Sequence, residues 1–234
     1  MANKTTGCDS TITRVVRVVP TPIASFDKPG IGCLGDVIEF KNSSAIHSGI
    51  MDYKWYFGDG DTSELNSPIH EYLSAGSFNV RLVVTSQPYG IVKDTIQSVL
   101  VSEIPKVAFT VLNKCEGIAV DFLNKSTIGS GTLTYDWNFG DGSANSTATD
   151  PNHLYAITGG YKVTLKAKAN GCISTLTKSA YTFAKPVANF SVPAGKFCTD
   201  NEVQFSNLST LKDGSMGQLW DFTDGSEATV ENPN

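Results

Sequence analysis

Residues Trp55-Tyr56-Phe57-Gly58-Asp59-Gly60 form a pattern that returns at Trp137-Asn138-Phe139-Gly140-Asp141-Gly142. Along a β-strand, side chains two positions apart lie on the same face, so the tryptophan and the phenylalanine can enter one core together. The Gly-Asp-Gly that follows is typical of a tight turn, because glycine accepts positive φ angles and aspartate hydrogen-bonds to the backbone two residues further on. The pattern therefore predicts a buried strand that ends in a tight turn.

The pattern belongs to an internal repeat of about 82 residues. Trp55, Trp137 and Trp220 are 82 and 83 residues apart, and one series of cysteines and one of phenylalanines have the same spacings. This period is too long for a solenoid unit and suits a small autonomous domain. We therefore expect a window from a longer tandem array. Its parts are residues 1–20 (the final strand of a preceding repeat plus a linker), 21–104 (repeat 1), 105–185 (repeat 2) and 186–234 (the truncated first half of repeat 3).

Within each repeat, the hydrophobic pattern predicts short β-strands. In residues 161–169, apolar side chains alternate with lysine and threonine, as in a strand with one buried face. Asn170-Gly171 is expected to form a hairpin turn, with residues 173–183 as the return strand. No window has a sustained helical period. About six or seven strands in each repeat indicate an all-β fold of tandem immunoglobulin-like β-sandwiches.

Taken together, these motifs resemble the PKD (polycystic kidney disease) domain. The signature of that family is a Trp-x-Phe-Gly-Asp-Gly turn, a Pro-x-His-x-Tyr segment and a Gly-x-Tyr-x-Val-x-Leu strand. The matching motif residues are Trp55, Phe57, Gly58, Asp59, Gly60, His70, Tyr72, Trp137, Phe139, Gly140, Asp141, Gly142, His153, Tyr155, Trp220 and Asp224. The third copy departs from the signature at Thr223. The resemblance implies an elongated array of PKD-like sandwiches, as in large bacterial surface or secreted proteins.

The polar residues of these motifs are expected to be structural. The repeated histidine and tyrosine are expected to tie a loop to the turn by hydrogen bonds. Asp59, Asp61 and Asp141 are weak calcium candidates, because the segment that starts at Asp59 fails the EF-hand pattern, which requires glycine at the sixth position and glutamate at the twelfth. Nucleophile elbows, zinc-protease motifs and phosphate loops are absent, so we expect no catalytic residue, no cofactor and no enzyme activity.

Composition and charge exclude further classes. The 234 residues carry 18 basic and 23 acidic side chains, a net charge of −5, which offers no basic face for nucleic acid. No apolar run approaches the roughly 18–20 residues of a membrane-spanning helix. The first seven residues lack the apolar region of a signal peptide, which predicts either a cytosolic protein or a missing upstream part. Because both ends of the sequence match incomplete copies of the repeat, we expect that an upstream part is missing.

The cysteines leave two pairings open. One class precedes the second strand (Cys33, Cys115 and Cys198), and the other lies in the last hairpin (Cys8 and Cys172). Recurrence in an extracellular-looking β array favours disulfides. Pairing within a repeat would join Cys115 to Cys172, and pairing across repeats would join Cys33 to Cys172. The resemblance to bacterial repeats in which both cysteines occur together favours the bond within a repeat.

The expected function is that of a non-catalytic, extracellular spacer in a large bacterial cell-surface adhesin or filament protein. The expected partners are neighbouring repeats of the same protein, with a cell-surface glycan or protein as a further possibility. The alternative is an accessory module of a secreted hydrolase that binds its polysaccharide or protein substrate.

Overall fold

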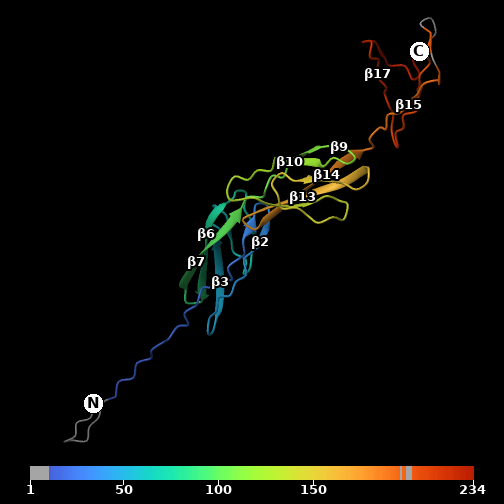
Figure 1. Cartoon of the computed structure of the whole chain (residues 1–234). Helices are drawn as coiled ribbons and strands as arrows, with labels where there is room; N and C mark the ends of the chain where they lie inside the picture. Colours follow the sequence, from blue (N-terminus) through green and yellow to red (C-terminus); the bar gives the residue numbers. More distant parts are fainter. Residues whose placement is uncertain (1–10, 196, 199–201) are drawn as a thin grey trace, which may run out of the picture. The chain divides into compact units, whose positions relative to one another are not determined.

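The computed structural model describes residues 11–195, 197–198 and 202–234, and all regular structure in them is β (Figure 1). The all-β prediction is confirmed. The chain divides into two compact units, Met1–Glu103 and Ile104–Asn234. None of the described residues forms a helix with the length and apolar character that a membrane span needs.

Repeat 1 lies in the first unit and consists of two facing sheets. Its strands are β1 (Gly32–Cys33), β2 (Val37–Glu39), β3 (Ile50–Tyr56), β4 (Thr62–Ser63), β5 (Ile69–Glu71), β6 (Gly76–Gln87) and β7 (Ile91–Ser102). One sheet has the order β1-β7-β6-β3-β4, and β2 pairs with β5 in the other. The core between them contains Phe26, Phe40, Trp55, Leu82 and Val99, each at most 3% exposed.

Repeat 2, in the second unit, has the same plan. Its strands are β8 (Phe109–Leu112), β9 (Lys114–Cys115), β10 (Val120–Asn124), β11 (Thr134–Asn138), β12 (Asn152–His153), β13 (Gly159–Ala169) and β14 (Cys172–Phe183). The sheets have the orders β12-β10-β8 and β11-β13-β14-β9. Phe109, Phe122, Trp137, Val163 and Leu165 fill the core at the positions that alternation predicts.

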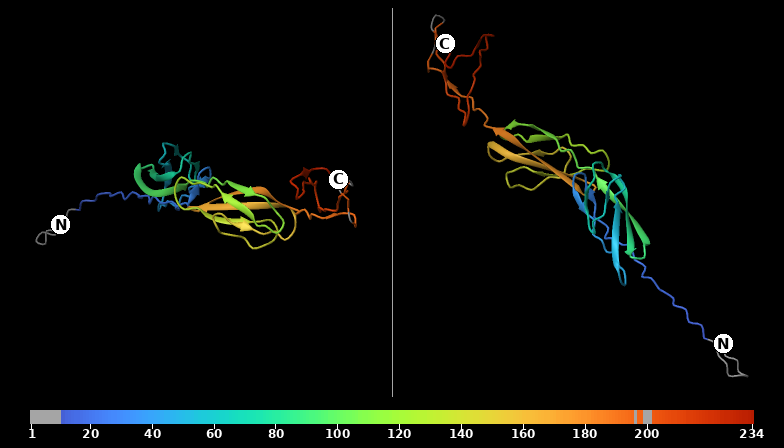
Figure 2. Two further views of the ribbon diagram at one scale, coloured as in Figure 1. Left: turned by 45° about the horizontal axis from the view of Figure 1, so that its top comes forward. Right: turned by 180° about the vertical axis from the view of Figure 1, so that it is seen from behind.

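The longest element of repeat 2 is the hairpin of β13 and β14, coloured yellow to orange in Figure 2. Buried and accessible residues alternate along β13, because one face covers the core and the other meets solvent. Asn170 and Gly171 form the turn with φ angles of 49° and 88°, as the Asn-Gly pair predicts.

The chain passes through repeat 2 from one end of this hairpin to the other. Lys106 pairs with Thr127, and the carbonyl of Ser130, three residues on, accepts a hydrogen bond from the Asn170 side chain at the hairpin turn. The chain leaves after Phe183, the last residue of β14. We call the end with the hairpin turn the incoming end of the repeat, and the end at Phe183 the outgoing end.

The predicted disulfide between Cys115 and Cys172 is wrong. Cys33 and Cys172 are disulfide-bonded, whereas Cys115 and Cys198 are exposed free thiols. The strand β9 runs parallel to the last residues of β14, so Cys115 lies beside Phe183 at the outgoing end. Cys172 begins the twelve-residue β14, which places it roughly 35 Å away at ~3.3 Å per residue. A disulfide requires Cα atoms about 4–7 Å apart.

The described residues of the third copy form four short strands. These are β15 (Phe190–Ser191), β16 (Ser206–Asn207), β17 (Trp220–Asp221) and β18 (Glu227–Ala228). The aromatic cluster of the other repeats is present, since Phe205 lies 5.8 Å from Trp220 and 5.4 Å from Phe222 between ring centroids. Trp220 is only half-buried, whereas Trp55 and Trp137 are fully buried.

The four proposed domain boundaries stay a prediction. Residues 1–10, with Cys8, lie outside the described residues, and residues 11–20 form no strand. Ile12, Val16 and Val18 in this segment are 82–91% exposed. A final strand requires the preceding strands of its own repeat as partners. The prediction for residues 1–20 can therefore be tested only on a chain that contains those strands.

Glycine at the first position of the turn is required by backbone packing. A Cβ on Gly140 would lie less than 2.5 Å from the carbonyl oxygen of Lys162, and its φ of +80° is strained for other residues. Gly142 has a similar φ of +82°, but a Cβ there would meet nothing within 4 Å. We therefore expect Gly140→Ala to lower the free energy of unfolding by about 3 kcal/mol or more and Gly142→Ala by about 1–2 kcal/mol.

Urea unfolding of the two variants measures this difference. Equal destabilisation by both substitutions would show that the contact with β13 does not constrain the turn.

Candidate functional site

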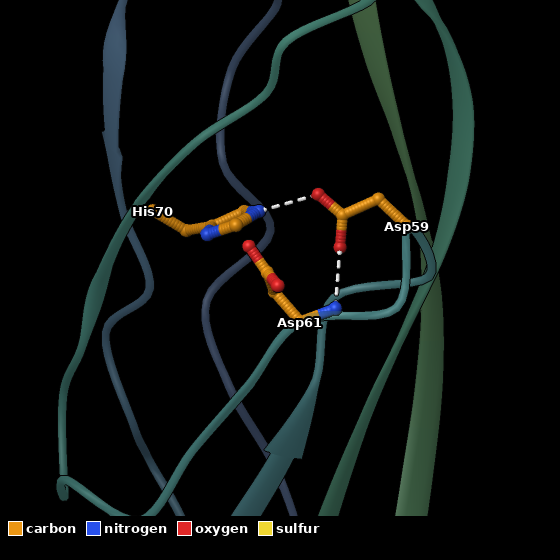
Figure 3. Close-up of side chains that lie close together, drawn as sticks. All are labelled: Asp59, Asp61 and His70. Atoms are coloured by element: carbon orange, nitrogen blue, oxygen red, sulfur yellow. Dashed lines mark hydrogen bonds and ion pairs between the residues drawn. The ribbon is translucent and has the colours of Figure 1, made fainter.

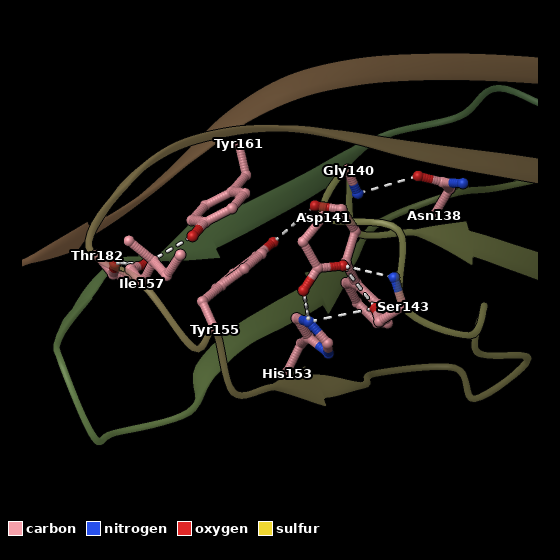
Figure 4. A network of polar contacts seen from close by, with 10 residues as sticks. Asn138, Gly140, Asp141, Ser143, His153, Tyr155, Ile157, Tyr161 and Thr182 are labelled. Atoms are coloured by element: carbon pink, nitrogen blue, oxygen red, sulfur yellow. Dashed lines mark hydrogen bonds and ion pairs between the residues drawn. The ribbon is translucent and has the colours of Figure 1, made fainter.

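The candidate site is the turn after β11 together with the histidine and tyrosine that follow it (Figure 4). Asp141 organises the turn, because its Oδ1 accepts hydrogen bonds from the backbone N–H (3.1 Å) and the hydroxyl (2.6 Å) of Ser143. In repeat 1, Asp59 Oδ1 accepts a hydrogen bond from the N–H of Asp61 at 3.1 Å. In both repeats, the carboxylate of the turn aspartate thus takes the place of a backbone carbonyl as the acceptor of this N–H.

A histidine closes the other side of the turn. His153 Nε2 lies 2.7 Å from Asp141 Oδ2, and His70 Nε2 lies 2.7 Å from Asp59 Oδ2. An ionised carboxylate only accepts, so Nε2 carries the proton and donates it. The His153 ring stacks on Phe139 with centroids 4.1 Å apart and planes 1° apart. Both imidazoles are therefore held by a charge-assisted hydrogen bond and an aromatic face.

A buried tyrosine ties the same segment to the end of the tryptophan strand. Tyr155 OH donates a 3.0 Å hydrogen bond to the carbonyl of Phe139, and Tyr72 OH donates one of the same length to the carbonyl of Phe57. Burial raises the pKa of both phenols, with a further contribution from the nearby aspartate. The Tyr155 ring also stacks on Tyr161 at 3.9 Å, which continues the aromatic stack into β13.

The surroundings of the turn aspartates alter their pKa values. Partial burial alone would raise the pKa of Asp141, but hydrogen bonds from Ser143 and His153 outweigh it and lower the pKa to about 2. Burial and the hydrogen bond from His70 oppose each other in the same way at Asp59, whose pKa is also lowered. Both carboxylates are held in their charged form.

Two other repeated side chains satisfy the backbone. The indole N–H of Trp55, Trp137 and Trp220 donates to the carbonyls of Leu65, Ala148 and Val230 at 3.0–3.1 Å. The asparagines of three glycosylation-like sequons, Asn42, Asn124 and Asn207, each accept a 2.9 Å hydrogen bond from the N–H two residues on. These asparagines therefore form Asx turns within the fold.

The described residues of the third copy form the same aspartate turn. Asp224 Oδ1 accepts from the Ser226 N–H at 2.9 Å and from its hydroxyl at 2.6 Å, as Asp141 does with Ser143. Thr223 replaces the first glycine of the turn and has no positive φ. Gly58 and Gly140 pack against the backbones of β6 and β13, whereas no described strand of the third copy packs against Thr223 in this way.

Two of the three calcium candidates, Asp59 and Asp61, lie close together in repeat 1, whereas Asp141 lies in repeat 2. Asp59, Asp61 and His70 offer ligand atoms that lie within 4.8 Å of one another (Figure 3). Both oxygens of Asp59 already accept hydrogen bonds, from His70 and from the Asp61 N–H. Calcium takes 6–8 oxygen ligands, and two carboxylates with an imidazole fall short of that set. In repeat 2, Ser143 occupies the position of Asp61, so Asp141 has no second carboxylate there.

Sequence reasoning missed the residues that hold the sequon turn from the opposite side. Ser67, Asp150 and Asn232 each precede a proline of the repeat, and their side chains accept the N–H of Asn42, Asn124 and Asn207, respectively, at 2.7–3.2 Å. The three residues differ in type but share a side-chain oxygen. Their position before the proline in all three copies is the signal that could have found them.

The buried hydroxyl of Tyr155 provides a first test of the site. Tyr155→Phe leaves the Phe139 carbonyl without this donor, so we expect the free energy of unfolding to fall by about 1–3 kcal/mol. Tyr161→Phe is the matched control, because its hydroxyl bonds to the Ile157 carbonyl at an exposed position. We expect about 0.5 kcal/mol or less for the control. Equal losses in thermal or urea unfolding would contradict the role of the buried hydrogen bond.

The charged state of Asp141 provides a second test. A carboxyl whose pKa is lower in the folded chain stabilises the fold above the unfolded value near pH 4, and that contribution is lost as the pH falls towards 2. We expect Asp141→Asn to lose less stability than the wild type between pH 4 and pH 2. Ser143→Ala removes one donor to the carboxylate and should move acid unfolding to higher pH. Identical acid profiles for the wild type and Asp141→Asn would contradict this.

The chain matches known proteins over both repeats. A family model described as PKD domain matches residues 19–98 and 103–184. A microbial collagenase of Vibrio alginolyticus is 35% identical over 75 residues, which are 31% of this chain and 9% of that protein. The PKD1 domain of Vibrio cholerae metalloprotease PrtV is 32% identical and covers 35% of this chain and 96% of its own, with a TM-score of 0.32.

The PKD1 domain of Vibrio anguillarum Epp is similar at 29% identity, covering 35% of this chain and 93% of that domain, with a TM-score of 0.32. This chain spans only a small part of the collagenase that it matches. The family model, in contrast, covers more than half of this chain in two successive matches. The chain therefore belongs to the PKD domain family and contains two PKD domains in tandem.

Proposed function

We propose that the chain is a non-catalytic spacer segment of a bacterial extracellular protein, which holds a distal adhesive or catalytic part away from the cell or forms part of a surface filament. The observation that carries the proposal is the use of the polar side chains at the turn. Asp141 pairs with His153, and Tyr155 donates to the Phe139 carbonyl, so all three side chains are used inside their own repeat. Their counterparts in repeat 1 make the same contacts. Side chains committed in this way stabilise a domain and leave no activated nucleophile or base.

The path of the chain supports a spacer role. In repeat 2 the chain enters at one end of a twelve-residue strand and leaves at the other, so a repeat advances the chain by a few tens of Å at ~3.3 Å per residue. Three residues, Glu103–Pro105, separate the last strand of repeat 1 from Lys106 of repeat 2. A short junction that contains proline favours a stiff connection over a flexible one.

Extracellular placement is part of the same proposal. PKD domains occur in secreted bacterial proteins such as the matched metalloprotease, and they are non-catalytic modules. A disulfide-bonded cysteine pair suits an oxidising compartment. The proposed partners are neighbouring repeats of the same protein, and a cell-surface glycan or protein.

Small-angle scattering of this chain tests the spacer proposal. A single compact globule of 234 residues would have a radius of gyration of about 17–18 Å. For repeats joined end to end we expect at least ~25 Å, with strands of ~35–40 Å contributed by each repeat. A value near that of the globule would overturn the spacer function.

The second candidate is an accessory module that binds the substrate of a secreted hydrolase. The similarity to a collagenase and to a metalloprotease domain favours it. Retention of the purified chain on insoluble collagen, chitin or cellulose after washing would support this function. Elution of the chain in the first wash from all three would leave the spacer function in place.

A further inference from the structure

The solvent-facing side of the β13–β14 hairpin in repeat 2 combines lysines with aromatic rings (Figure 2). Buried and accessible residues alternate along β13, so Lys162, Lys166 and Lys168 lie on one face, and all three are exposed. Tyr181 and Phe183 lie on the same face at the outgoing end of β14, where they are exposed as well. We call the surface formed by these five residues the lysine face.

The lysine face is positively charged, although the whole chain carries a net charge of −5. None of its three lysines forms an ion pair with a described residue. Asp136, opposite Lys166, is the one acid among the described outward-facing residues of β11, β13 and β14, and its Oδ1 accepts a 2.8 Å hydrogen bond from Asn145. Three positive charges against one negative charge give the surface a potential that attracts anions. The net charge of the chain did not predict this local basic face.

Two aromatic rings extend the lysine face at its outgoing end. Tyr181 and Phe183 are 46% and 54% exposed, with ring centroids 6.4 Å apart and planes 14° apart. Gly160 lies opposite Tyr181, and a Cβ there would lie only 3.0 Å from Cε1 of that ring, so glycine leaves room for the ring beside β13. Exposed rings of this kind offer apolar surfaces on which a ligand can stack.

Hydroxyl groups lie between the lysines. The hydroxyls of Thr164 and Thr177 are 2.8 Å apart, and Ser179 Oγ accepts a 3.3 Å hydrogen bond from Lys162 Nζ. Thr175 lies opposite Lys166. A hydroxyl both donates and accepts hydrogen bonds, so this row of side chains can bond to the hydroxyls of a sugar as well as to an anion.

Repeat 1 has different side chains on the equivalent face. The positions of the three lysines and the two aromatic residues are occupied there by Asn79, Val83, Thr85, Leu100 and Ser102. Arg81 on that face is ion-paired with Asp94 at 2.8 Å. The PKD fold therefore does not require the lysine face, which belongs to repeat 2 alone of the two repeats.

We propose that the lysine face binds a linear acidic polysaccharide of the polyuronate type, which lies along the β13–β14 hairpin. The lysines pair with its carboxylates, Tyr181 and Phe183 stack on its sugar rings, and the threonine and serine hydroxyls bond to its hydroxyls. The proposal rests on the proposed spacer function and deepens it, because it names the class of the glycan partner and the surface that binds it.

The spacing of the lysines favours a polyuronate over a nucleic acid. Lys166 lies four residues after Lys162, ~13 Å along the strand, and Lys168 lies ~7 Å further on. The phosphates of a nucleic-acid strand follow one another every ~3.4 Å, so three lysines would leave most phosphates over this length unpaired. The carboxylates of a polyuronate are spaced more widely, because each belongs to a separate sugar ring.

Native affinity electrophoresis with soluble polygalacturonate in the gel tests the proposal. We expect polygalacturonate to retard the chain, and the effect to weaken as the salt concentration rises from about 0.05 to 0.5 M. Uncharged dextran should have no effect. Absence of retardation by polygalacturonate, or equal retardation by dextran, would overturn the proposal. Equal retardation by polyglutamate or single-stranded DNA would indicate a surface for any polyanion and would overturn it too.

Matched variants locate the binding surface. Lys162→Gln, Lys166→Gln and Lys168→Gln combined should weaken binding about 10-fold or more, and Tyr181→Ala should weaken it about 2- to 10-fold. Lys93→Gln and Tyr89→Ala change exposed side chains of the repeat 1 hairpin and should leave binding unchanged. Equal losses in these controls would contradict the assignment to the lysine face.

Two further readouts separate the possible failures. All the substituted side chains are exposed, so each variant should unfold at the same temperature as the wild type, and a loss of binding then reports on the surface and not on the fold. Failure to bind polygalacturonate together with a large radius of gyration would overturn the glycan proposal and leave the spacer function in place. A compact globule that binds polygalacturonate would do the reverse.

Discussion

The placement of one indole ring determines much of each PKD repeat. Trp55 and Trp137 are fully buried, and each still donates its N–H to a loop carbonyl about ten residues further on. A buried donor without a partner is costly, so the loop after the turn must return to the tryptophan. The turn glycine and the aspartate set the direction in which the chain leaves the tryptophan strand. The tyrosine then fixes the returning segment to the end of that strand.

The strands and the hairpin could be predicted from the sequence because their signals are local. Alternation along residues 161–169 and the Asn-Gly pair at 170–171 depend on neighbouring positions alone, and β13 and the hairpin turn follow them. The pairing of Cys115 depends instead on β9, a two-residue strand with no periodic signal. Its parallel position beside the end of β14 arises from long-range packing, so the sequence left two pairings open and the family resemblance favoured the wrong one.

The turn site shows a similar division. The repeated Asp, His and Tyr indicated a structural tie, and the aspartate–histidine contacts of 2.7 Å and the tyrosine hydrogen bonds of 3.0 Å supply it. The contribution of Ser143 was hidden, because repeat 1 has Asp61 at that position. The two residues use the same backbone N–H towards the turn aspartate but differ in side-chain chemistry. Comparison of the repeats thus identifies the residues whose side chains the fold needs. It does not predict the contacts of a position, such as 61 and 143, where the residue type differs between repeats.

The opposite placement of the two chain ends within a repeat has a consequence for the evolution of such arrays. A domain that receives the chain at one end and releases it at the other can be duplicated or deleted without threading one copy through another. Copy number can then change in single genetic steps while every core stays as it is. The length of the encoded protein becomes a quantity that selection can adjust in units of one domain.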